Sequence, residues 1–412
     1  MPEEQGVIRR IAWRELCPWL MLFRTFRLSI SLPVLLLATV GALLTPLGWQ
    51  LSGFLFIGKD SGDSYFQRVV EENGSWPDLA ARSITNSNSE MEPAGALPAA
   101  FSNLHAVYRR FTEPFRRLSD TGGTDTATQI TRSAYFLFGG IWNVAVWAFL
   151  AGAITRIAAV YLGREERVSL RDALQYAARN YGWYLASPFF PLLGVMLIAI
   201  PLIAIGLLMR FSLGVFLAGL LWVLILIGGL VMAILLLGLM FGWPLMWPVI
   251  SSEEGGDAFE AFSRSYSYTF QRPLHYLFFA TVTVLFGGLC WLLVSQFSAA
   301  VVDLPLWVTS WGATVDRIEM VTSGGGNGLE WTGGGLIRAL NKLVMSVAAG
   351  FNYSFFFCAA TAIYLLLRRE YDRTELDEVF VVEQEDQYGL PPLPEREMPG
   401  RAATDPVAPE AT

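Results

Sequence analysis

The sequence predicts an all-α integral membrane protein with six transmembrane helices. First, 53% of the 412 residues are hydrophobic and only 16% are charged, a balance too apolar for a soluble domain. Second, several apolar runs reach the ~18 to 20 residues that cross a hydrocarbon core of about 30 Å as a helix. Third, short polar and aromatic segments separate these runs. The predicted spans are Leu28–Leu47, Tyr135–Ile154, Phe189–Leu208, Phe216–Gly242, Leu274–Phe297 and Val344–Leu367.

The first span follows a basic, aromatic segment, residues 1–27, and no convincing small-residue cleavage site comes after it. A secretory signal peptide would end in such a site. We therefore expect the first span to be a retained anchor.

Two of the segments between spans repeat one another. Residues 171–188 align with the segment before Pro273 without a gap, at a shift of 85 (257 − 172). The arginine-to-proline spacing occurs once more, from Arg24 to Pro33. The repeat predicts three units, each an interfacial amphipathic helix followed by a pair of spans. The aligned pairs include Asp172 with Asp257, Arg179 with Arg264, Tyr181 with Tyr266 and Pro188 with Pro273.

Each repeated segment has the pattern of a helix that lies along the membrane surface. Ser169 followed by Asp172 resembles a capping box, and apolar residues recur at helical spacing through 169–185 and 257–270. Amphipathic helices too polar to cross a membrane place their aromatic rings at headgroup level. A cytoplasmic linker with coincidental aromatics is the alternative. The residues expected to contact lipid or an interface are Arg179, Arg264, Tyr181 and Tyr266.

The arginines next to the spans predict the topology. Most of them flank one side of the membrane, which should be the cytoplasmic side of a bacterial inner membrane. Both termini then lie in the cytoplasm. The predicted parts are a cytoplasmic basic segment (1–27), a first helix pair (28–156) with an external loop (53–132), a second unit (157–250), a third unit (251–368) with an external Gly/Trp loop (303–335), and a tail (369–412).

Three regions outside the spans carry further expectations. The segment 104–118, LHAVYRRFTEPFRRL, predicts an amphipathic helix that packs on its own domain or, as the alternative, binds anionic headgroups. The Gly/Trp loop has no Gly-Lys-Ser/Thr, so a flexible linker is favoured over a phosphate-binding loop. The tail is acidic and proline-rich, which predicts disorder. It is either plainly solvated or docks a protein partner.

The predicted spans contain few side chains that could bind or react with a polar substrate, because no charged residue lies near the middle of any of them. Their polar residues Asn143, Gln296 and Asn352 should hydrogen-bond between helices, with substrate contact as the alternative. Cys290 and Cys358 are expected to be small buried residues, and the two histidines make a histidine-based metal site improbable.

A compact acidic group stands just before the third unit: Glu253, Glu254 and Asp257. Such a group normally caps a helix and interacts with its dipole. Glu260 precedes Arg264 by four residues, which is a favourable helical pair. We therefore predict no catalytic, cofactor-binding or metal-binding residue, and no basic domain suggests nucleic acid as a partner.

The stretch LMWPVISSEEGGDAFEAFSRSYSYTFQRPLHYLFF, residues 245–279, carries a resemblance to a known group of proteins. It resembles bacterial polytopic proteins related to the membrane domain that accompanies some glycerophosphodiester phosphodiesterases, and similar uncharacterised families. Residues 168–193 match more faintly. The resemblance implies no catalytic residues here, because the phosphodiesterase chemistry of those proteins belongs to a separate soluble domain.

These observations favour a non-enzymatic polytopic inner-membrane protein that organises or regulates a partner or its lipid environment. The alternative is a channel or carrier for an uncharged or lipophilic solute. A membrane-embedded enzyme comes third. A hydrated polar path through the bundle would distinguish a carrier, and the sequence indicates none.

Overall fold

The computed structural model describes residues 17–57, 69–71, 73, 93–117 and 126–380. These residues form helices joined by turns and contain no strand, so the predicted all-α class is confirmed. By length and composition six of the helices can cross a membrane, which makes the chain a multi-pass membrane protein. These are α3 (Leu32–Phe56), α7 (Thr126–Gly163), α10 (Phe189–Leu208), α12 (Trp222–Ser252), α14 (Pro273–Ala313) and α16 (Leu329–Asp372).

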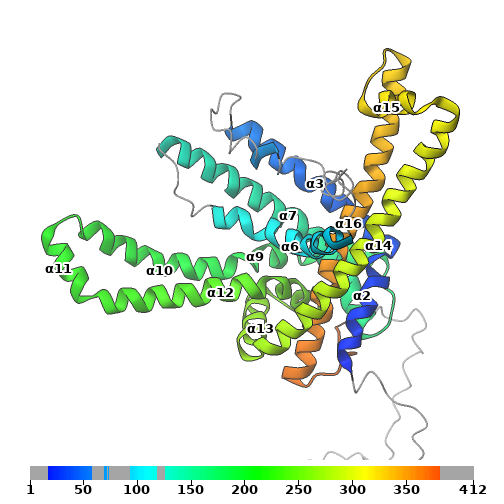
Figure 1. The fold of residues 1–412 in the computed structure, drawn as a ribbon. Coiled ribbons are helices and arrows are strands. Elements are labelled where there is room, and N and C mark those ends of the chain that lie inside the picture. The colour runs from blue at the N-terminus through cyan, green and yellow to red at the C-terminus, as the bar shows by residue number, and fades with distance from the viewer. Residues whose placement is uncertain (1–16, 58–68, 72, 74–92, 118–125, 381–412) are drawn as a thin grey trace, which may run out of the picture. The chain divides into compact units, whose positions relative to one another are not determined.

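The other helices precede or connect these six in the chain (Figure 1). They are η1 (Pro18–Leu20), α2 (Met21–Ser29), α6 (Pro93–Arg117), α8 (Leu170–Arg179), α9 (Tyr181–Ala186), α11 (Ser212–Leu220), α13 (Ala258–Gln271) and α15 (Val315–Ser323).

The first span begins later than predicted. Leu28 belongs to α2, and α3 starts at Leu32 after a turn in which Ser31 is extended (φ −64°, ψ 139°). Pro33 follows in the first turn of α3, where a missing N–H breaks no helical hydrogen bond. The proline therefore fits the first turn of α3 and does not interrupt it.

The helices α3 and α7 are held together by tryptophan side chains that pack against glycines of the facing helix. A Cβ added to Gly48 would lie 1.9 Å from Trp142, and one added to Gly139 would lie 2.2 Å from Trp49. The Trp142 Nε1 atom also donates to the Leu44 carbonyl at 3.1 Å. Small residues let apolar helices approach closely where no hydrophobic force pulls them together in lipid. The sequence GALLTPLGW thus forms the helix contact.

The helix expected at 169–185 is divided in two at Asn180, which has φ −99° and ψ 9° and lies between α8 and α9. Its side-chain amide donates to the Tyr176 carbonyl at 3.2 Å, and this local bond competes with continuation of the helix. Ser169 does cap α8 as the capping-box pattern predicts, because its hydroxyl accepts from the Asp172 N–H at 3.2 Å.

The fourth span does not begin at residue 216, because α11 occupies residues 212–220 and forms the corner between α10 and α12. Leu221, with φ −92° and ψ 5°, separates α11 from α12. α12 then continues ten residues beyond the predicted end, Gly242, through Pro244 and Pro248 to Ser252. This continuation is buried, so packing overrides the two prolines.

The Gly/Trp loop predicted at 303–335 is largely helical, which corrects the expected flexible linker. α14 runs to Ala313, α15 follows, and α16 begins at Leu329. The helices are interrupted at Thr314 (φ 70°) and over residues 324–328, where Gly324, Gly326 and Gly328 adopt positive φ. Trp307 and Trp311, one helical turn apart, stack edge to face at 4.7 Å on α14. The glycines therefore permit one reversal between two long helices.

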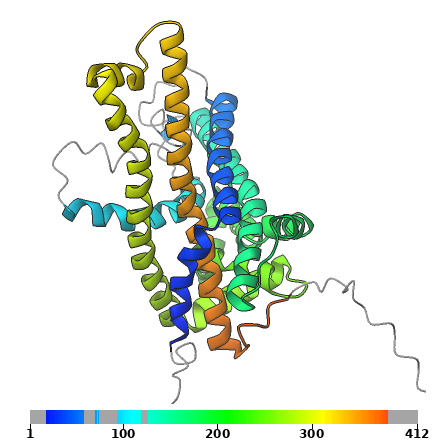
Figure 2. The same cartoon turned by 90° about the vertical axis from the view of Figure 1, so that its right-hand side faces the viewer.

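The helix α6 crosses the long helices α14 and α16 (Figure 2). Its apolar residues Leu104, Val107 and Phe111 are buried, and the Tyr108 hydroxyl donates to the Met240 carbonyl of α12 at 2.5 Å. Of the two sequence-based expectations for this segment, packing on its own domain is the one these contacts fit.

The end of α16 and the residues after it also differ from the predicted tail. The helix continues to Asp372, and Val379 is buried beside Gly163 at the end of α7. The Arg368 guanidinium donates to the Glu378 carbonyl at 2.9 Å. Residues 373–379 therefore fold back onto the helices, while residues 381–412 lie outside the described residues.

The contact between α3 and α7 gives a first prediction. Gly48→Ala should lower the free energy of unfolding by about 1 to 3 kcal/mol, because its methyl group overlaps Trp142. Thermal unfolding in detergent measures the change. The matched control is Gly206→Ala on α10, where nothing lies within 4 Å of the added atom. Equal stability of the two variants would contradict the packing described.

Candidate functional site

The turn between α12 and α13 places a carboxylate inside the protein. Glu253 follows the last residue of α12 in an extended conformation, and Gly255 (φ +67°) reverses the chain. Asp257 then begins α13 by accepting from the Glu260 N–H at 2.7 Å. Asp257 therefore caps α13, as the acidic group predicts. Glu253 takes no part in this cap.

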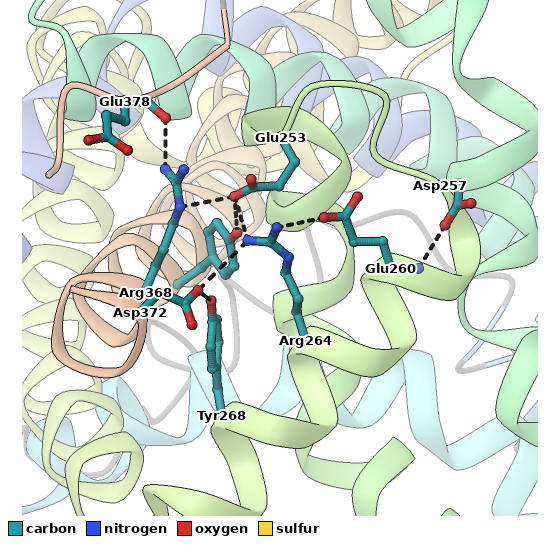
Figure 3. A network of polar contacts seen from close by, with 9 residues as sticks. Glu253, Asp257, Glu260, Arg264, Tyr268, Arg368, Asp372 and Glu378 are labelled. Carbon is teal, nitrogen blue, oxygen red and sulfur yellow. Dashed lines mark hydrogen bonds and ion pairs between the residues drawn. The ribbon is translucent and has the colours of Figure 1, made fainter. Parts of the chain in front are cut away.

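Glu253 is the centre of a buried charge cluster (Figure 3). The side chain is 8% exposed and lies 3.0 Å from Nε of Arg368 and 3.2 Å from a guanidinium nitrogen of Arg264. The Tyr364 hydroxyl donates to the same carboxylate at 2.6 Å. A buried carboxylate is tolerated only when it is paired and hydrogen-bonded. Glu253 thus joins the ends of α12, α13 and α16.

Arg264 extends the cluster toward its own helix and toward the end of α16. It pairs with Glu260 at 2.7 Å, the predicted helical pair, and lies 3.7 Å from Asp372. Burial lowers the pKa of Arg264, but its tyrosine and carboxylate neighbours raise it further, so that the net shift is upward. The guanidinium therefore stays charged, and three carboxylates share it, those of Glu253, Glu260 and Asp372.

A second polar cluster joins α7, α8 and α12. Arg156, 4% exposed, donates to the Ser251 carbonyl at 2.7 Å, and its guanidinium lies 4.2 Å from the centre of the Tyr176 ring. The Ser251 hydroxyl lies within hydrogen-bond distance of Thr155 and of Tyr184, at 2.6 and 2.7 Å. Burial is the main reason why the pKa of Tyr184 lies above its usual value. The cluster thus pairs one cation with a carbonyl acceptor and an aromatic ring, and neutral hydroxyl groups bond to one another beside it.

A third polar region is a partly open cavity of about 400 Å³, lined by residues of α3, α6 and α7 together with Val69 and Asn73. Glu113 of α6 pairs there with Arg109 at 3.3 Å and with Arg117. Arg110 donates to the Tyr353 hydroxyl of α16 at 3.0 Å. The cavity therefore brings the charges of a segment outside the predicted spans against the middle of those spans.

The four residues expected at an interface have different surroundings. The Tyr181 hydroxyl donates to the Ala145 carbonyl at 3.2 Å and the Tyr266 hydroxyl donates to the Leu235 carbonyl at 2.5 Å. Arg264 belongs to the charge cluster, while Arg179 is exposed at the end of α8. The structure therefore does not bring the two arginines into matching contacts, and lipid contact by any of the four stays a prediction.

The three polar residues of the spans also differ. Asn143 is 2% exposed and donates to the Arg110 carbonyl of α6 at 3.3 Å. Asn352 is half-buried and Gln296 is exposed, and neither makes a side-chain hydrogen bond with another described residue. Cys290 and Cys358 are buried free thiols, as expected for small core residues.

Sequence reasoning missed the partners of Glu253 and the role of Arg156. Arg368 stands 115 residues after Glu253 (368 − 253), and no local spacing joins them. The available signal was that both Arg156 and Arg368 directly follow apolar runs, where positive charge also has the ordinary role of flanking a membrane helix.

Comparison with family models, with curated proteins and with solved structures finds no match for this chain.

The charge cluster gives a second prediction. Glu253→Gln should lower the free energy of unfolding by about 3 kcal/mol, because it leaves the buried Arg368 without its carboxylate. Glu254→Gln is the matched control, since Glu254 is the next residue, carries the same charge and is exposed. Chemical or thermal unfolding in detergent compares them.

A compensating pair sharpens this test. In Glu253→Leu combined with Arg368→Met both buried charges are gone, so much of the lost stability should return. If Glu253→Gln were as stable as Glu254→Gln, the cluster would not hold the helix ends together.

Proposed function

We propose that this chain is a non-enzymatic polytopic protein of a bacterial inner membrane that organises or regulates a partner or its lipid environment. The observation that carries the proposal is an apolar arm, residues 189–242, formed by α10, α11 and the first two thirds of α12. Only 6% of the most apolar stretch of α10, and 6% of that of α12, is buried inside the protein. In Figure 1 α10 and α12 run side by side away from the other helices.

The arm has more apolar surface than its own packing uses. Leu193, Leu197 and Leu224 are each more than 60% exposed. A helix pair that is hydrophobic all round belongs in a membrane or against other helices. The bilayer alone can cover such a surface, but the arm also carries small residues where a further helix could approach.

One face of α12 has the small residues that membrane helices use for contact. Gly229 and Ala233, four residues apart, are both exposed, and nothing lies within 4 Å of a Cβ added to Gly229. Small residues at this spacing let two backbones come close in lipid. By contrast, Gly228 of the same helix packs against Ile198 of α10. This difference favours a helix of a partner protein on the Gly229 face.

The three-unit arrangement is part of the same proposal. Two tyrosines at matched positions of the repeat, Tyr181 and Tyr266, each donate to a carbonyl of the span that precedes them in the chain, Ala145 and Leu235. This shared contact supports a duplicated structural role. In this arrangement both termini are cytoplasmic, and α2, α8 with α9, and α13 lie at the inner surface.

A carrier is the second candidate function. The cavity between α3, α6 and α7 favours it, because a polar cavity beside the middle of the spans is a first requirement of a path. Its arginine lining suits an anion better than the uncharged or lipophilic solute expected from the sequence.

Photo-crosslinking tests the arm as a contact surface. A photoreactive residue at position 229 or 224 should give discrete protein adducts in native membranes, and the same residue at the buried position Ala148 should give only intramolecular products. Gly229→Leu should remove the adduct formed by a photoreactive residue at position 226, which is exposed and lies one turn before Gly229 on the same face, while leaving thermal stability unchanged. Adducts with lipid alone would assign the arm to lipid, and no difference from position 148 would contradict an exposed arm.

Cysteine labelling tests the orientation. In a chain freed of its native cysteines, Asp316→Cys on α15 should react with an impermeant reagent from outside, and Arg171→Cys on α8 should not. Both positions are exposed, so burial does not limit labelling at either. The reverse pattern would place both termini outside.

A further inference from the structure

The helices α14 and α16 are longer than a membrane crossing requires. α14 has 41 residues and α16 has 44, so at 1.5 Å per residue each is about 60 Å long or longer. A hydrocarbon core about 30 Å thick is crossed in about 40 Å even by a helix tilted by about 40°. A considerable part of each helix therefore lies outside the core.

Exposed charges show which part of these helices lies outside. Asp303 of α14 and Lys342 of α16 are both exposed, whereas charged residues within the hydrocarbon are rare and face the protein interior. The sequence has no Asp, Glu, Lys or Arg between Arg272 and Asp303, or between Lys342 and Arg368. The crossing segments therefore lie between these two pairs of charges. Residues 303–342, which we call the projecting hairpin, lie beyond the core.

The projecting hairpin is held together by its own contacts. Figure 2 shows α14 and α16 continuing together to α15. Arg317 of α15 pairs with Glu330 of α16 at 2.5 Å, and the Arg338 guanidinium donates to the Val321 carbonyl at 2.6 Å. Because these contacts fix the three helices to one another, a partner that binds the hairpin has less ordering entropy to overcome.

The projecting hairpin exposes apolar side chains where no hydrocarbon covers them. Leu304, Trp307, Val308 and Trp311 of α14 are each more than 50% exposed. Val302 is buried, and Leu304 lies about 200° around the helix from it. The exposed residues therefore lie on the side of α14 away from its packed side, and contiguous apolar surface of this kind marks an interaction site.

The exposed apolar side of α14 has the spacing of a helix-pairing surface. Its residues recur at alternating intervals of three and four, which is the heptad pattern of a coiled coil. Valine occupies each a position and a larger apolar residue occupies each d position. β-Branched residues at a with leucine at d favour a parallel pair of helices. The residues of this stripe, in the order a, d, a, d, a, d, are Val294, Phe297, Val301, Leu304, Val308 and Trp311.

We infer that the projecting hairpin binds a second copy of this chain, with the two α14 stripes forming a parallel pair. Two copies that share one membrane orientation and are related by a twofold axis along the membrane normal place their α14 helices parallel, as the stripe requires. The exposed parts of the stripe and Trp307 amount to roughly 600 to 800 Å² per chain, close to the ~800 Å² per partner of a standard interface. This pairing does not involve the apolar arm, so the two can be tested separately.

Disulfide crosslinking tests the geometry of the pair. The full chain, freed of its native cysteines, is placed in phosphatidylcholine vesicles and oxidised. Leu304→Cys should join two copies, because a d position lies next to its counterpart in a parallel pair. Thr309→Cys is the matched control, since Thr309 is exposed on the same helix but lies outside the stripe.

A charge placed in the stripe tests its contribution to association. Val308→Glu should weaken dimerisation at least about tenfold, because it would bury a carboxylate without a partner. Thr309→Glu adds the same charge one residue away and should leave dimerisation unchanged. Single-molecule photobleaching in vesicles, at several protein-to-lipid ratios, measures the fraction of dimer. Val308 is 54% exposed in the single chain, so the melting temperature of the variant should equal that of Thr309→Glu.

Four outcomes would overturn the inference. The parent chain could stay monomeric at every protein-to-lipid ratio, which would assign the stripe to a different protein. Leu304→Cys could crosslink no better than Thr309→Cys, or Val308→Glu could dimerise like the parent chain. Finally, a spin label at position 308 could report hydrocarbon depth, which would place the stripe in lipid.

Discussion

The packing of the Phe111 ring against other aromatic rings is the interaction on which the arrangement of the described helices most depends. This ring, 5% exposed, lies between rings of three spans, namely Trp147 of α7, Trp243 and Trp247 of α12, and Phe357 of α16. Aromatic rings bury large areas and fix geometry at once. Together with Leu104, Val107 and the Tyr108 hydroxyl, this side chain anchors α6, which is too polar to cross a membrane, across helices that can. The cavity, and the arginines in it, exist only because α6 is held there.

A different constraint governs the ends of the helices. Glu253 is buried, and a buried carboxylate must be compensated on all sides. Arg368, Arg264 and Tyr364 supply that compensation from two other helices. The cluster therefore fixes the relative positions of α12, α13 and α16, because the buried carboxylate must be paired with cations. By contrast, α3 and α7 are held by tryptophan side chains packed against glycines. The apolar arm has no such charge cluster among its described residues, and little of its surface is buried inside the protein. This exposed surface is consistent with contact to lipid or to a partner.

Local signals in the sequence were sufficient to predict those features that depend on a single helix, namely its existence and its first residue. The hydrophobic runs predicted the existence of all six long helices, and Ser169 and Asp257 predicted helix starts that the hydrogen bonds confirm. Boundaries were less predictable. α12 passes through Pro248 because its last residues are buried among other helices, and in the Gly/Trp region α15 is joined to α16 by Arg338, which donates to the Val321 carbonyl at 2.6 Å. Neither effect is visible in a window of neighbouring residues.

By itself, then, the sequence determined the class of the protein, the number of apolar helices and the caps of α8 and α13, because hydropathy, helical periodicity and side-chain-to-backbone bonds act over one or two turns. Only the tertiary structure decided which charges meet. Glu253 and Arg368 are 115 residues apart, and α6 reaches the middle of the spans through Phe111. Such pairings are set by the packing of whole helices against one another, which also brings Arg109, Arg110 and Arg117 of α6 to the lining of a cavity.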